Sequence, residues 1–344
     1  MSTTIKDIAR QAGVSHTTVS RALHHSPLIS EDTTRRIQAI ALELNYHPSV
    51  AARSLKTNRT QALGVIVSHI DDPFFSEILQ GIDDVAQANG YSLFIAASQH
   101  DLGREKAIMQ TMREHRVDGV ILCSPRYARE QGHPLYSSEI PLVTVNNQAV
   151  DDYPYSIYHD DVDGAQQACT HLIHLGHRQI AFLGDSTSGR TTQERLAGYR
   201  QTMLGAGLEI YEAYIHLVPG SGALQGYEAA NYFLGLEHVP SALICYNDMM
   251  AVGVLKRLHQ AGIRIPEDIS VTGFDNIAVS EYTSPPLTTI DQPKRFLGAE
   301  AARMMLEQLG MIPGLNELSP KVKRLKGTLL VRGSTAKLAS IEEL

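Results

Sequence analysis

The first 45 residues carry an apolar pattern with helical spacing, and turn-forming residues interrupt it. One stripe in the first segment consists of Ile5, Ile8, Ala9 and Ala12. Thr4 can cap this helix together with Asp7, three residues on, and Gly13 can end it and allow a tight turn. Ser15 can cap a second helix, whose inward face would consist of Val19, Ala22 and Leu23. The pattern therefore predicts a helix, a sharp turn and a helix.

The opposite face of the second helix is polar. Helical spacing places four side chains on one exposed ridge, namely His16, Thr17, Ser20 and Arg21. Threonine, serine and arginine reach phosphates and base edges, and arginine is suited to guanine. A short amphipathic hairpin with a solvated face gives the same pattern, so both interpretations stay open at this point.

A third helix is predicted from Ser30, and its core positions would be Ile37, Ile40, Ala41 and Leu44. Beyond it, Pro48 stops continuation, and Ser49 can cap a helix of barely two turns over residues 50–55. A helix that short is unstable alone in water. It would need a partner or a ligand to form.

After residue 60 the pattern changes to strands that alternate with helices. The near-continuous apolar run at residues 62–70 is expected of a parallel strand covered on both faces, and further strands are predicted at residues 91–98, 119–124 and 141–147. A helix is predicted at about residues 75–89. A second series has helices at about residues 164–175 and from about residue 191, and strands at residues 179–185, 241–248 and 269–275. The alternation predicts doubly wound parallel sheets in two subdomains.

Polar and aromatic residues recur where these strands end. They are Asp71, Asp72, Phe74, Phe75, Asn146, Asn147, Asp160, Asp161, Asn247, Asp248 and Asp275. Capping of the following helix is the better explanation for any single Asp or Asn. Ligands of open α/β sheets bind beyond the carboxyl ends of the strands, so recurrence in both subdomains favours a shared cleft.

Length and composition narrow the class of protein. The 344 residues suffice for two or three domains, and 43% hydrophobic residues can fill large cores. No apolar run approaches the roughly 20 residues of a membrane span, and the N-terminal MSTTIKDIAR has no apolar secretory region. We expect a cytoplasmic protein without a membrane segment. Cys123, Cys169 and Cys245 lie in separate apolar contexts, which favours reduced core residues over disulfides.

The net charge of −7 alone argues against a nucleic-acid partner, but the charge is unevenly distributed. Residues 1–60 hold eight Lys/Arg against four Asp/Glu, whereas the remaining residues hold 22 against 33. A basic head on an acidic body is expected of a modular DNA-binding protein.

Two segments carry a family resemblance. TIKDIARQAGVSHTTVSRAL (residues 4–23) and LNYHPSVAARSLKTNRT (residues 44–60) resemble the lac-repressor (LacI/GalR) family of transcription regulators, and the resemblance continues to VRGST at residues 331–335. It implies a DNA-binding transcription regulator of the repressor type, with no enzymatic activity and no cofactor. Such a protein binds a pseudo-palindromic operator in double-stranded DNA as a homodimer and responds to a small effector, commonly a sugar and sometimes a purine.

The resemblance also implies a domain organisation. A helix-turn-helix domain would span residues 1–48, a hinge helix and linker residues 49–60, a core residues 61–335, and a tail residues 336–344. The periplasmic-binding-protein-like core would consist of an N-subdomain (about 61–161 and 292–324) and a C-subdomain (about 162–291 and 325–335). The chain would then cross between them near residues 162, 291 and 325.

The family resemblance also implies roles for individual residues. The second helix would enter the major groove, and paired hinge helices would enter the minor groove, where Leu55 wedges between base pairs. The implied DNA-binding residues are Thr4, Ser15, His16, Thr17, Ser20, Arg21, Ala52, Leu55 and Lys56. The implied effector-binding residues are Asp71, Phe74, Phe75, Asn146, Asp160, Arg195, Asn247 and Asp275.

Among these effector-binding roles, the family resemblance implies those of Arg195 and Asp275 most strongly. Both side chains can bind vicinal hydroxyls through paired hydrogen bonds, and Arg195 can also bind an anionic group. The sequence departs from the family near residue 220, where an aromatic wall is common but this chain reads VPGSGALQG and contains no Trp. This departure favours a polar, sugar-like effector over a flat purine.

Three alternatives compete with this interpretation. GDSTSGRT (residues 184–191) resembles the phosphate-binding loop of an ATPase, but Arg190 stands where a Lys is usual and is not an equivalent point charge. His171, His174 and His177 resemble metal ligands, but Gly176 breaks the helix between them and no Cys or carboxylate completes a set, so no metal site is predicted. The third alternative, a periplasmic sugar receptor, predicts a signal peptide and the absence of a DNA-binding head. The sequence fits neither expectation.

Overall fold

The computed structural model describes residues 3–23, 26–46, 59–125, 140–146, 154–313 and 322–338. The chain divides into two compact units, residues 1–60 and residues 61–344, and each is described by itself. The predicted hinge helix, with Ala52, Leu55 and Lys56, lies outside the described residues.

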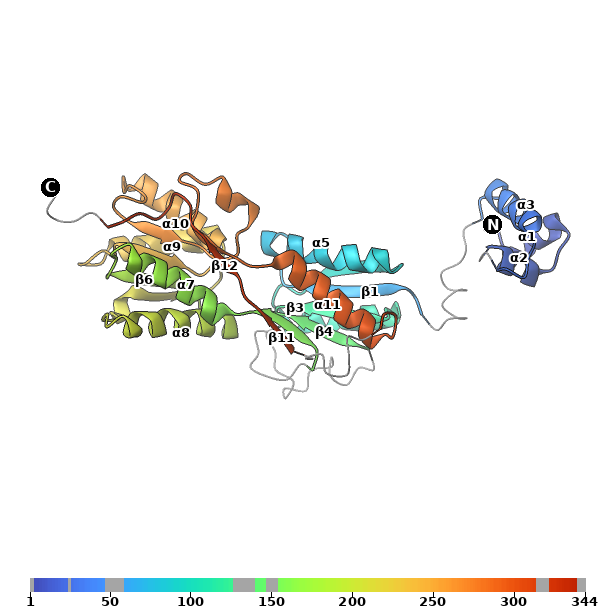
Figure 1. Ribbon diagram of the computed structural model, residues 1–344, viewed down its shortest axis with the longest axis horizontal. Helices are drawn as coiled ribbons and strands as arrows, with labels where there is room; N and C mark the ends of the chain where they lie inside the picture. The colour runs from blue at the N-terminus through green and yellow to red at the C-terminus, as the bar shows by residue number, and fades with distance from the viewer. Residues whose placement is uncertain are drawn as a thin grey trace. The chain divides into compact units, whose positions relative to one another are not determined.

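The first unit is a small helical head (Figure 1). Its described residues form α1 (Ile5–Ala12), α2 (His16–Leu23) and α3 (Glu31–Glu43). The predicted capping pair is present, because the Thr4 backbone N–H donates to the Asp7 carboxylate at 3.0 Å and the Thr4 hydroxyl donates to it at 2.6 Å. Gly13 ends α1 in the left-handed region, with φ at 65°, which glycine adopts without steric cost. The head core contains fully buried side chains from all three helices, including Ile8, Val19 and Ile37.

The second unit begins with a six-stranded sheet in the order β11-β5-β4-β3-β1-β2, and its neighbouring strands pair in parallel. The strands are β1 (Ala62–Val67), β2 (Ser92–Ala97), β3 (Gly119–Cys123), β4 (Leu142–Val145), β5 (Ser156–His159) and β11 (Val322–Leu325). Three helices cover this sheet, namely α5 (Pro73–Ala88), α6 (Leu102–Glu114) and α11 (Lys294–Gln308). Successive side chains of β1 point to opposite faces of the sheet. Val65 therefore packs in the core under α5 and α11, and Ile66 packs in the core under α6.

A four-stranded parallel sheet in the order β7-β6-β8-β9 forms the other half of this unit. Its strands are β6 (Ile180–Asp185), β7 (Ile215–Val218), β8 (Ala242–Cys245) and β9 (Ser270–Thr272). The helices are α7 (Asp161–His174), α8 (Gly189–Gly205), α9 (Ala223–Leu234) and α10 (Asp248–Gln260), with short 3-10 turns at Glu212–Tyr214 and Ala278–Glu281. One core lies between the sheet and α9 and α10, and another between the sheet and α7 and α8. The predicted fold class, a helical head followed by two doubly wound sheets, is confirmed.

The chain passes between the two sheets three times (Figure 1). The first link runs from β5 into α7, and the second runs from β10 (Thr289–Asp291) into α11. The third runs from β11 into β12 (Thr328–Leu330), which pairs antiparallel with β10. These links fall near the expected crossings, while the exact subdomain boundaries stay predictions.

Two helices begin earlier than the apolar pattern predicts. α5 starts at Pro73 because the Asp72 carboxylate accepts the Phe74 backbone N–H at 3.0 Å. α7 starts at Asp161 because the Asp160 carboxylate accepts the Asp163 backbone N–H at 3.2 Å. Capping side chains therefore fix these starts. The three cysteines are buried and form no disulfide, as expected.

Candidate functional site

A cleft lies where the carboxyl ends of both sheets meet. Its inner cavity has a volume of about 70 Å³ and is lined from the six-stranded sheet by Asp72, Phe74 and Asn146, among others. From the four-stranded sheet it is lined by residues that include Arg195 and Asp275. An outer cavity of about 330 Å³ adjoins it and shares Asp72 with it. The cleft is therefore the place where one ligand can touch both halves of the core.

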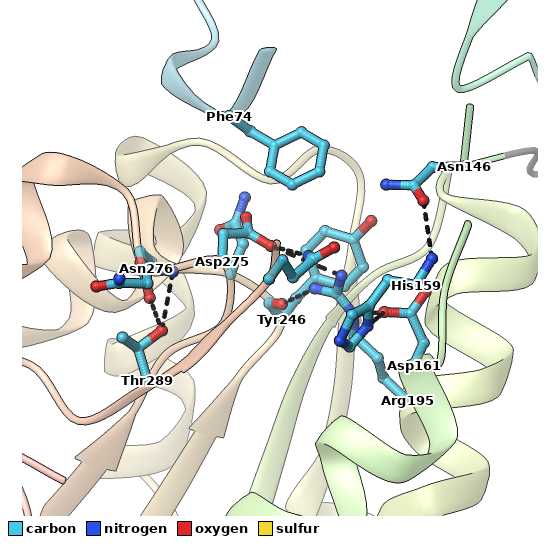
Figure 2. Close-up of polar contacts among 12 residues, drawn as sticks. Phe74, Asn146, His159, Asp161, Arg195, Tyr246, Asp275, Asn276 and Thr289 are labelled. Atoms are coloured by element: carbon cyan, nitrogen blue, oxygen red, sulfur yellow. Dashed lines mark hydrogen bonds and ion pairs between the residues drawn. The ribbon is translucent and has the colours of Figure 1, made fainter. Parts of the chain in front are cut away.

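The Arg195 guanidinium lines the inner cavity and takes part in several of the polar contacts drawn in Figure 2. It is 6% exposed, its Nε donates to Asp161 Oδ1 at 3.0 Å, and its Nη2 lies 3.7 Å from Asp275 Oδ1. Its Nη1 donates to the backbone carbonyl of Tyr246. The guanidinium carbon also lies 3.6 Å from the centroid of the Phe274 ring, within the range of a cation–π contact. The side chain is thus held from several sides, and two carboxyl groups, those of Asp161 and Asp275, lie beside its guanidinium.

The pKa values of these two carboxyl groups, Asp161 and Asp275, are shifted in opposite directions. Burial acts to raise the pKa of Asp161, but the Arg195 guanidinium and His159 outweigh burial, and the pKa falls below its usual value. Burial raises the pKa of Asp275 well above its usual value, and the charges of Asp248 and Asp72 add to burial while Arg195 opposes it. Asp161 therefore serves as the ionised partner of Arg195. Asp275 is the group that a hydrogen-bond donor on a ligand would stabilise.

The backbone at Asp275 is unusual. Its φ is 109° and that of Asn276 is 52°, so two consecutive non-glycine residues have positive φ. Such conformations cost free energy and persist when the surroundings fix them. Gln292 Nε2 donates to Asp275 Oδ1 at 2.6 Å, and the Asp275 backbone N–H donates to the Ile290 carbonyl at 2.9 Å. The loop after β9 is thereby fixed with the Asp275 carboxyl at the cavity.

Phe74 and Phe75 supply an apolar wall in the first turn of α5. Their rings make an edge-to-face contact with centroids 5.3 Å apart. Figure 2 shows Phe74 and Asn146 opposite Asp275, Tyr246 and Arg195. Asn146 is oriented by the His159 backbone N–H, which donates to its Oδ1 at 3.1 Å. Aromatic and amide groups from one sheet thus face charged groups from the other.

Most of the expected effector residues lie together. The inner cavity is lined by Phe74, Phe75, Asn146, Arg195, Asn247 and Asp275, and the outer cavity by Asp71. Asp160 lines neither cavity, because its Oδ1 caps α7 and its Oδ2 lies 3.8 Å from Arg324 Nη1. Asn247 lines the cavity and also caps α10 by accepting the Met250 N–H at 2.8 Å. In the structure Asp160 therefore caps α7 and faces Arg324, and the lining of the two cavities gives no support to its predicted contact with the effector.

Two residues that hold Arg195 in place were not predicted from the sequence. Asp161 is the ion-pair partner of Arg195, and Tyr246 holds the same guanidinium through its carbonyl and ring. The sequence has the adjacent pair Asp160–Asp161, but it did not show which of the two carboxylates pairs with Arg195. No sequence signal marked Tyr246, since any residue type could offer the carbonyl and the ring contact depends on the fold.

The polar ridge of the head is present as predicted. Three of the four predicted side chains on α2, those of His16, Thr17 and Arg21, are exposed, whereas Ser20 is half-buried. Val19 and Ala22, on the opposite face, are buried. The Ser15 hydroxyl accepts the Thr18 backbone N–H at 3.1 Å, so Ser15 caps α2. The DNA contacts of these residues, and of Thr4 and Ser20, stay predictions.

The ATPase-like loop and two of the three clustered histidines, His171 and His177, make structural hydrogen bonds. In the loop, the Asp185 carboxylate accepts hydrogen bonds from Thr187, Ser188 and Gly220. His171 Nε2 pairs with the Thr335 hydroxyl at 2.9 Å, and His177 Nε2 lies 3.1 Å from the Ala336 carbonyl. Within the ranges that the structure describes, no group of His, Cys, Asp or Glu side chains could hold a metal ion.

Comparison with known proteins identifies the class. Residues 4–49 match the family model for bacterial regulatory proteins of the lacI family, and residues 169–335 match the periplasmic binding protein-like domain. The HTH-type transcriptional repressor PurR of Photobacterium profundum is 35% identical over 308 residues, which cover 89% of this chain and 92% of that protein. The chain belongs to the lacI family of bacterial regulatory proteins. Its full-length relatives are DNA-binding transcriptional repressors, so the ATPase alternative is set aside.

Solved structures of lacI-family regulators share the fold. The lac repressor dimer bound to operator and the anti-inducer ONPF matches with a TM-score of 0.87 at 27% identity, covering 98% of this chain and all of that one. A lacI-family regulator from Enterococcus faecium with bound ribose matches with a TM-score of 0.71 at 27% identity, covering 81% of this chain and 100% of that chain. Among the described residues, no helix combines the length and apolar character that a membrane crossing requires.

Asp248 gives this lacI-family core a testable pH dependence. It is buried beside the Asp275 loop, and burial raises its pKa from 3.8 to about 7, although the Thr289 hydroxyl and the Ile277 N–H oppose the shift. A raised folded-state pKa contributes stability that is fully present below pH 3.8 and is lost as the pH rises to about 7. We therefore expect the free energy of unfolding of the wild type, relative to Asp248→Asn, to fall across this range. Urea unfolding of both proteins at several pH values measures it, and a difference independent of pH would contradict the assignment.

Proposed function

We propose that this lacI-family repressor acts in the cytoplasm as a homodimer and that a neutral, polyhydroxylated effector, most simply a sugar, controls its operator affinity from the cleft. The observation that carries the proposal is the buried Arg195 guanidinium between Asp161 and Asp275, opposite Phe74. Guanidinium and carboxylate groups bind vicinal hydroxyls through paired hydrogen bonds. The Phe74 ring offers an apolar surface to the face of a sugar ring.

The charges of the cleft favour a neutral ligand over an anionic one. Among the described lining residues, Arg195 is the sole Lys or Arg, and its charge is already paired with the ionised Asp161 carboxylate. Asp72 and Asp71 add further negative charge at the inner and outer cavities. A sugar phosphate would bring its own negative charge against these carboxylates, which is unfavourable.

The outer cavity supports a sugar over a flat purine. Around residue 220 its lining consists of Gly220, Ser221 and Gly222, which offer no aromatic face for a heterocycle to stack on. The related Enterococcus faecium regulator, which is 27% identical, was solved with bound ribose, and this supports a sugar as the ligand class. The PurR repressors are more similar, at 35% identity, so purines are the alternative that the experiment must test.

An exposed apolar edge supports the homodimer. β2 is the edge strand of its sheet, and on it Phe94 is 49% and Ile95 is 44% exposed. Ile70, which follows β1, is 69% exposed. Apolar patches of this kind are commonly covered in assemblies. A second copy of the chain is the occupant that we propose, because the related lac repressor is a dimer on its operator. Sedimentation of the full chain tests this.

A thermal-shift screen tests the effector class. The full-length protein is heated with D-ribose, D-glucose and cellobiose, with the corresponding monosaccharide phosphates, and with adenine, guanine and hypoxanthine. Binding to the folded state raises the melting temperature by mass action. We expect at least one neutral sugar to stabilise the protein and its phosphate to stabilise it less. Stabilisation by a purine or a phosphate alone would contradict the proposed class.

Arg21 should read one base position of the operator half-site. It is exposed on the ridge of α2, and an Arg that contacts a base edge contributes about 1–3 kcal/mol of discrimination. Arg21→Ala should weaken operator binding by that amount and relax the preference at one position. Selection from random DNA measures the preference of both proteins. Recovery of only asymmetric sites, or an unchanged preference in the variant, would count against a symmetric dimer that reads DNA through α2.

A further inference from the structure

Lys294 is a buried cation at the junction of the two sheets. It is the first residue of α11 and is 2% exposed. Its ammonium donates to the backbone carbonyls of Asp275 at 2.6 Å and Asn276 at 3.0 Å, and to that of Gln292 at 3.5 Å. The Glu77 carboxylate lies 3.3 Å from the same nitrogen, and the Asp291 carboxylate 3.9 Å. Five oxygens thus surround one ammonium.

Stability alone does not explain a lysine at this position. Burial of an ammonium costs several kcal/mol unless its partners are well placed. The N-terminus of a helix is also its positive end, which disfavours a cation. The surrounding oxygens offset these costs, and the result is a fixed geometry. Buried ionic groups of this kind can be kept for the arrangement that they specify.

The partners of Lys294 belong to the two sides of the cleft. The carbonyls of residues 275 and 276 lie in the loop after β9, which presents the Asp275 carboxyl to the cavity. Glu77 lies in α5, whose first turn supplies Phe74 to the opposite wall. α5 and α11 also pack closely, since a Cβ on Gly81 would lie 2.0 Å from the Arg295 carbonyl oxygen. Lys294 therefore contacts the loop of one wall and the helix of the other.

We propose that Lys294 is the positioning residue that couples the Asp275 loop to α5, so that effector contact at Asp275 changes the placement of the N-subdomain. Its ammonium stabilises the two positive-φ residues by binding both of their carbonyls. Its ion pair with Glu77 passes any displacement of that loop to α5. The inference rests on the proposed function in one respect, namely that Asp275 contacts the effector.

The test uses the full-length protein and four variants. Lys294→Met removes the cation and keeps the side-chain length, and Lys294→Arg restores the charge. Glu77→Gln weakens only the link to α5. Asp84→Asn is the matched control, because it removes the exposed ion pair between Asp84 and Arg295, which joins the same two helices away from Lys294.

Two readouts separate this proposal from the proposed function. The first is amide hydrogen exchange without ligand, which reports local opening. We expect Lys294→Met to speed exchange at residues 275–277 by about tenfold or more, and Lys294→Arg to restore much of the protection. The second is coupling, measured as the ratio of operator dissociation constants with and without D-ribose. This ratio of dissociation constants should approach 1 in Lys294→Met and fall several-fold in Glu77→Gln. It should stay at the wild-type value in Asp84→Asn.

Unchanged exchange at residues 275–277 in Lys294→Met would overturn the proposal, whether or not D-ribose binds. Wild-type coupling in Glu77→Gln would also overturn it, even if Lys294→Met fails to fold. If the wild type itself gives no response to D-ribose or to any other sugar of the screen, the proposed function fails while the exchange experiment still decides the positioning role.

Discussion

Asp275→Asn should abolish the response to the effector while leaving operator binding without effector near the wild-type value. Asp275 lines the inner cavity, and its Oδ1 lies 3.7 Å from Arg195 Nη2. Asparagine replaces one carboxyl oxygen by an NH2 group, so a sugar hydroxyl that donates to that oxygen is left unpaired in the buried cleft. An unpaired buried polar group costs about 1–3 kcal/mol, so the sugar should bind roughly ten to a hundred times more weakly. A ligand shifts an equilibrium only through unequal affinity for the two states, so loss of this contact removes the response.

Asp160→Asn is the matched control. Asp160 adjoins the Arg195 partner Asp161 in sequence, but it caps α7 and does not line the cleft. Asparagine caps a helix about as well as aspartate, so the fold should be kept. Calorimetric titration of the sugar into each protein measures the affinities. Wild-type affinity in Asp275→Asn, or a comparable loss in Asp160→Asn, would show that the cleft is assigned wrongly.

Gly298→Ala should destabilise the core by about 3 kcal/mol or more, because it overpacks a helix contact. A Cβ at this position in α11 would lie 2.0 Å from the backbone carbonyl oxygen of Ile78 in α5. A backbone atom cannot rotate away as a flexible side chain can. The two helices must therefore separate, and the core that they share under the six-stranded sheet must loosen.

Gly205→Ala is the control for this second prediction. Gly205 ends α8, and no heavy atom lies within 4 Å of a Cβ there. Alanine has the higher helix propensity, so this variant should be as stable as the wild type or more stable by up to about 1 kcal/mol. Urea unfolding followed by circular dichroism measures both variants. Equal stability of Gly298→Ala and the wild type would contradict the close contact between α5 and α11.

The head could be predicted almost completely from the sequence. Its helices are short, their apolar residues keep helical spacing, and local hydrogen bonds set their starts at Thr4 and Ser15. Capping and turn signals depend on neighbours in the chain, and such signals can be read without a tertiary structure.

The core was predicted in its order but not in all of its strands. The predicted runs supply most of the buried central strands of both sheets, because continuous apolar residues mark strands covered on two faces. β5 was not predicted, although it is largely buried, because it has only four residues and begins and ends with the polar Ser156 and His159. β11 was not predicted because its residues alternate between exposed and half-buried, and β7 is only partly buried. Their pairing depends on partner strands that lie far away in the sequence.

The residues of the site could also be predicted only in part. Arg195 and Asp275 could be placed in one cleft because they match family positions, and the structure brings them within 3.7 Å of each other. The choice between Asp160 and Asp161 could not be made, since one residue turns outward as a cap and the next turns inward to Arg195. Lys294 gave no sequence signal, because its partners are mostly backbone carbonyls brought together by the fold.

The central claim is that one effector in the cleft and one operator on the head are energetically coupled. The measurement is operator affinity, by fluorescence anisotropy of a labelled operator recovered by selection, with and without the sugar that gives the largest thermal shift. The sugar affinity is then measured with and without operator. We expect both affinities to change by the same factor, about 5- to 150-fold, because coupling free energies are reciprocal. A sugar that binds in the cleft and leaves operator affinity unchanged would contradict the account.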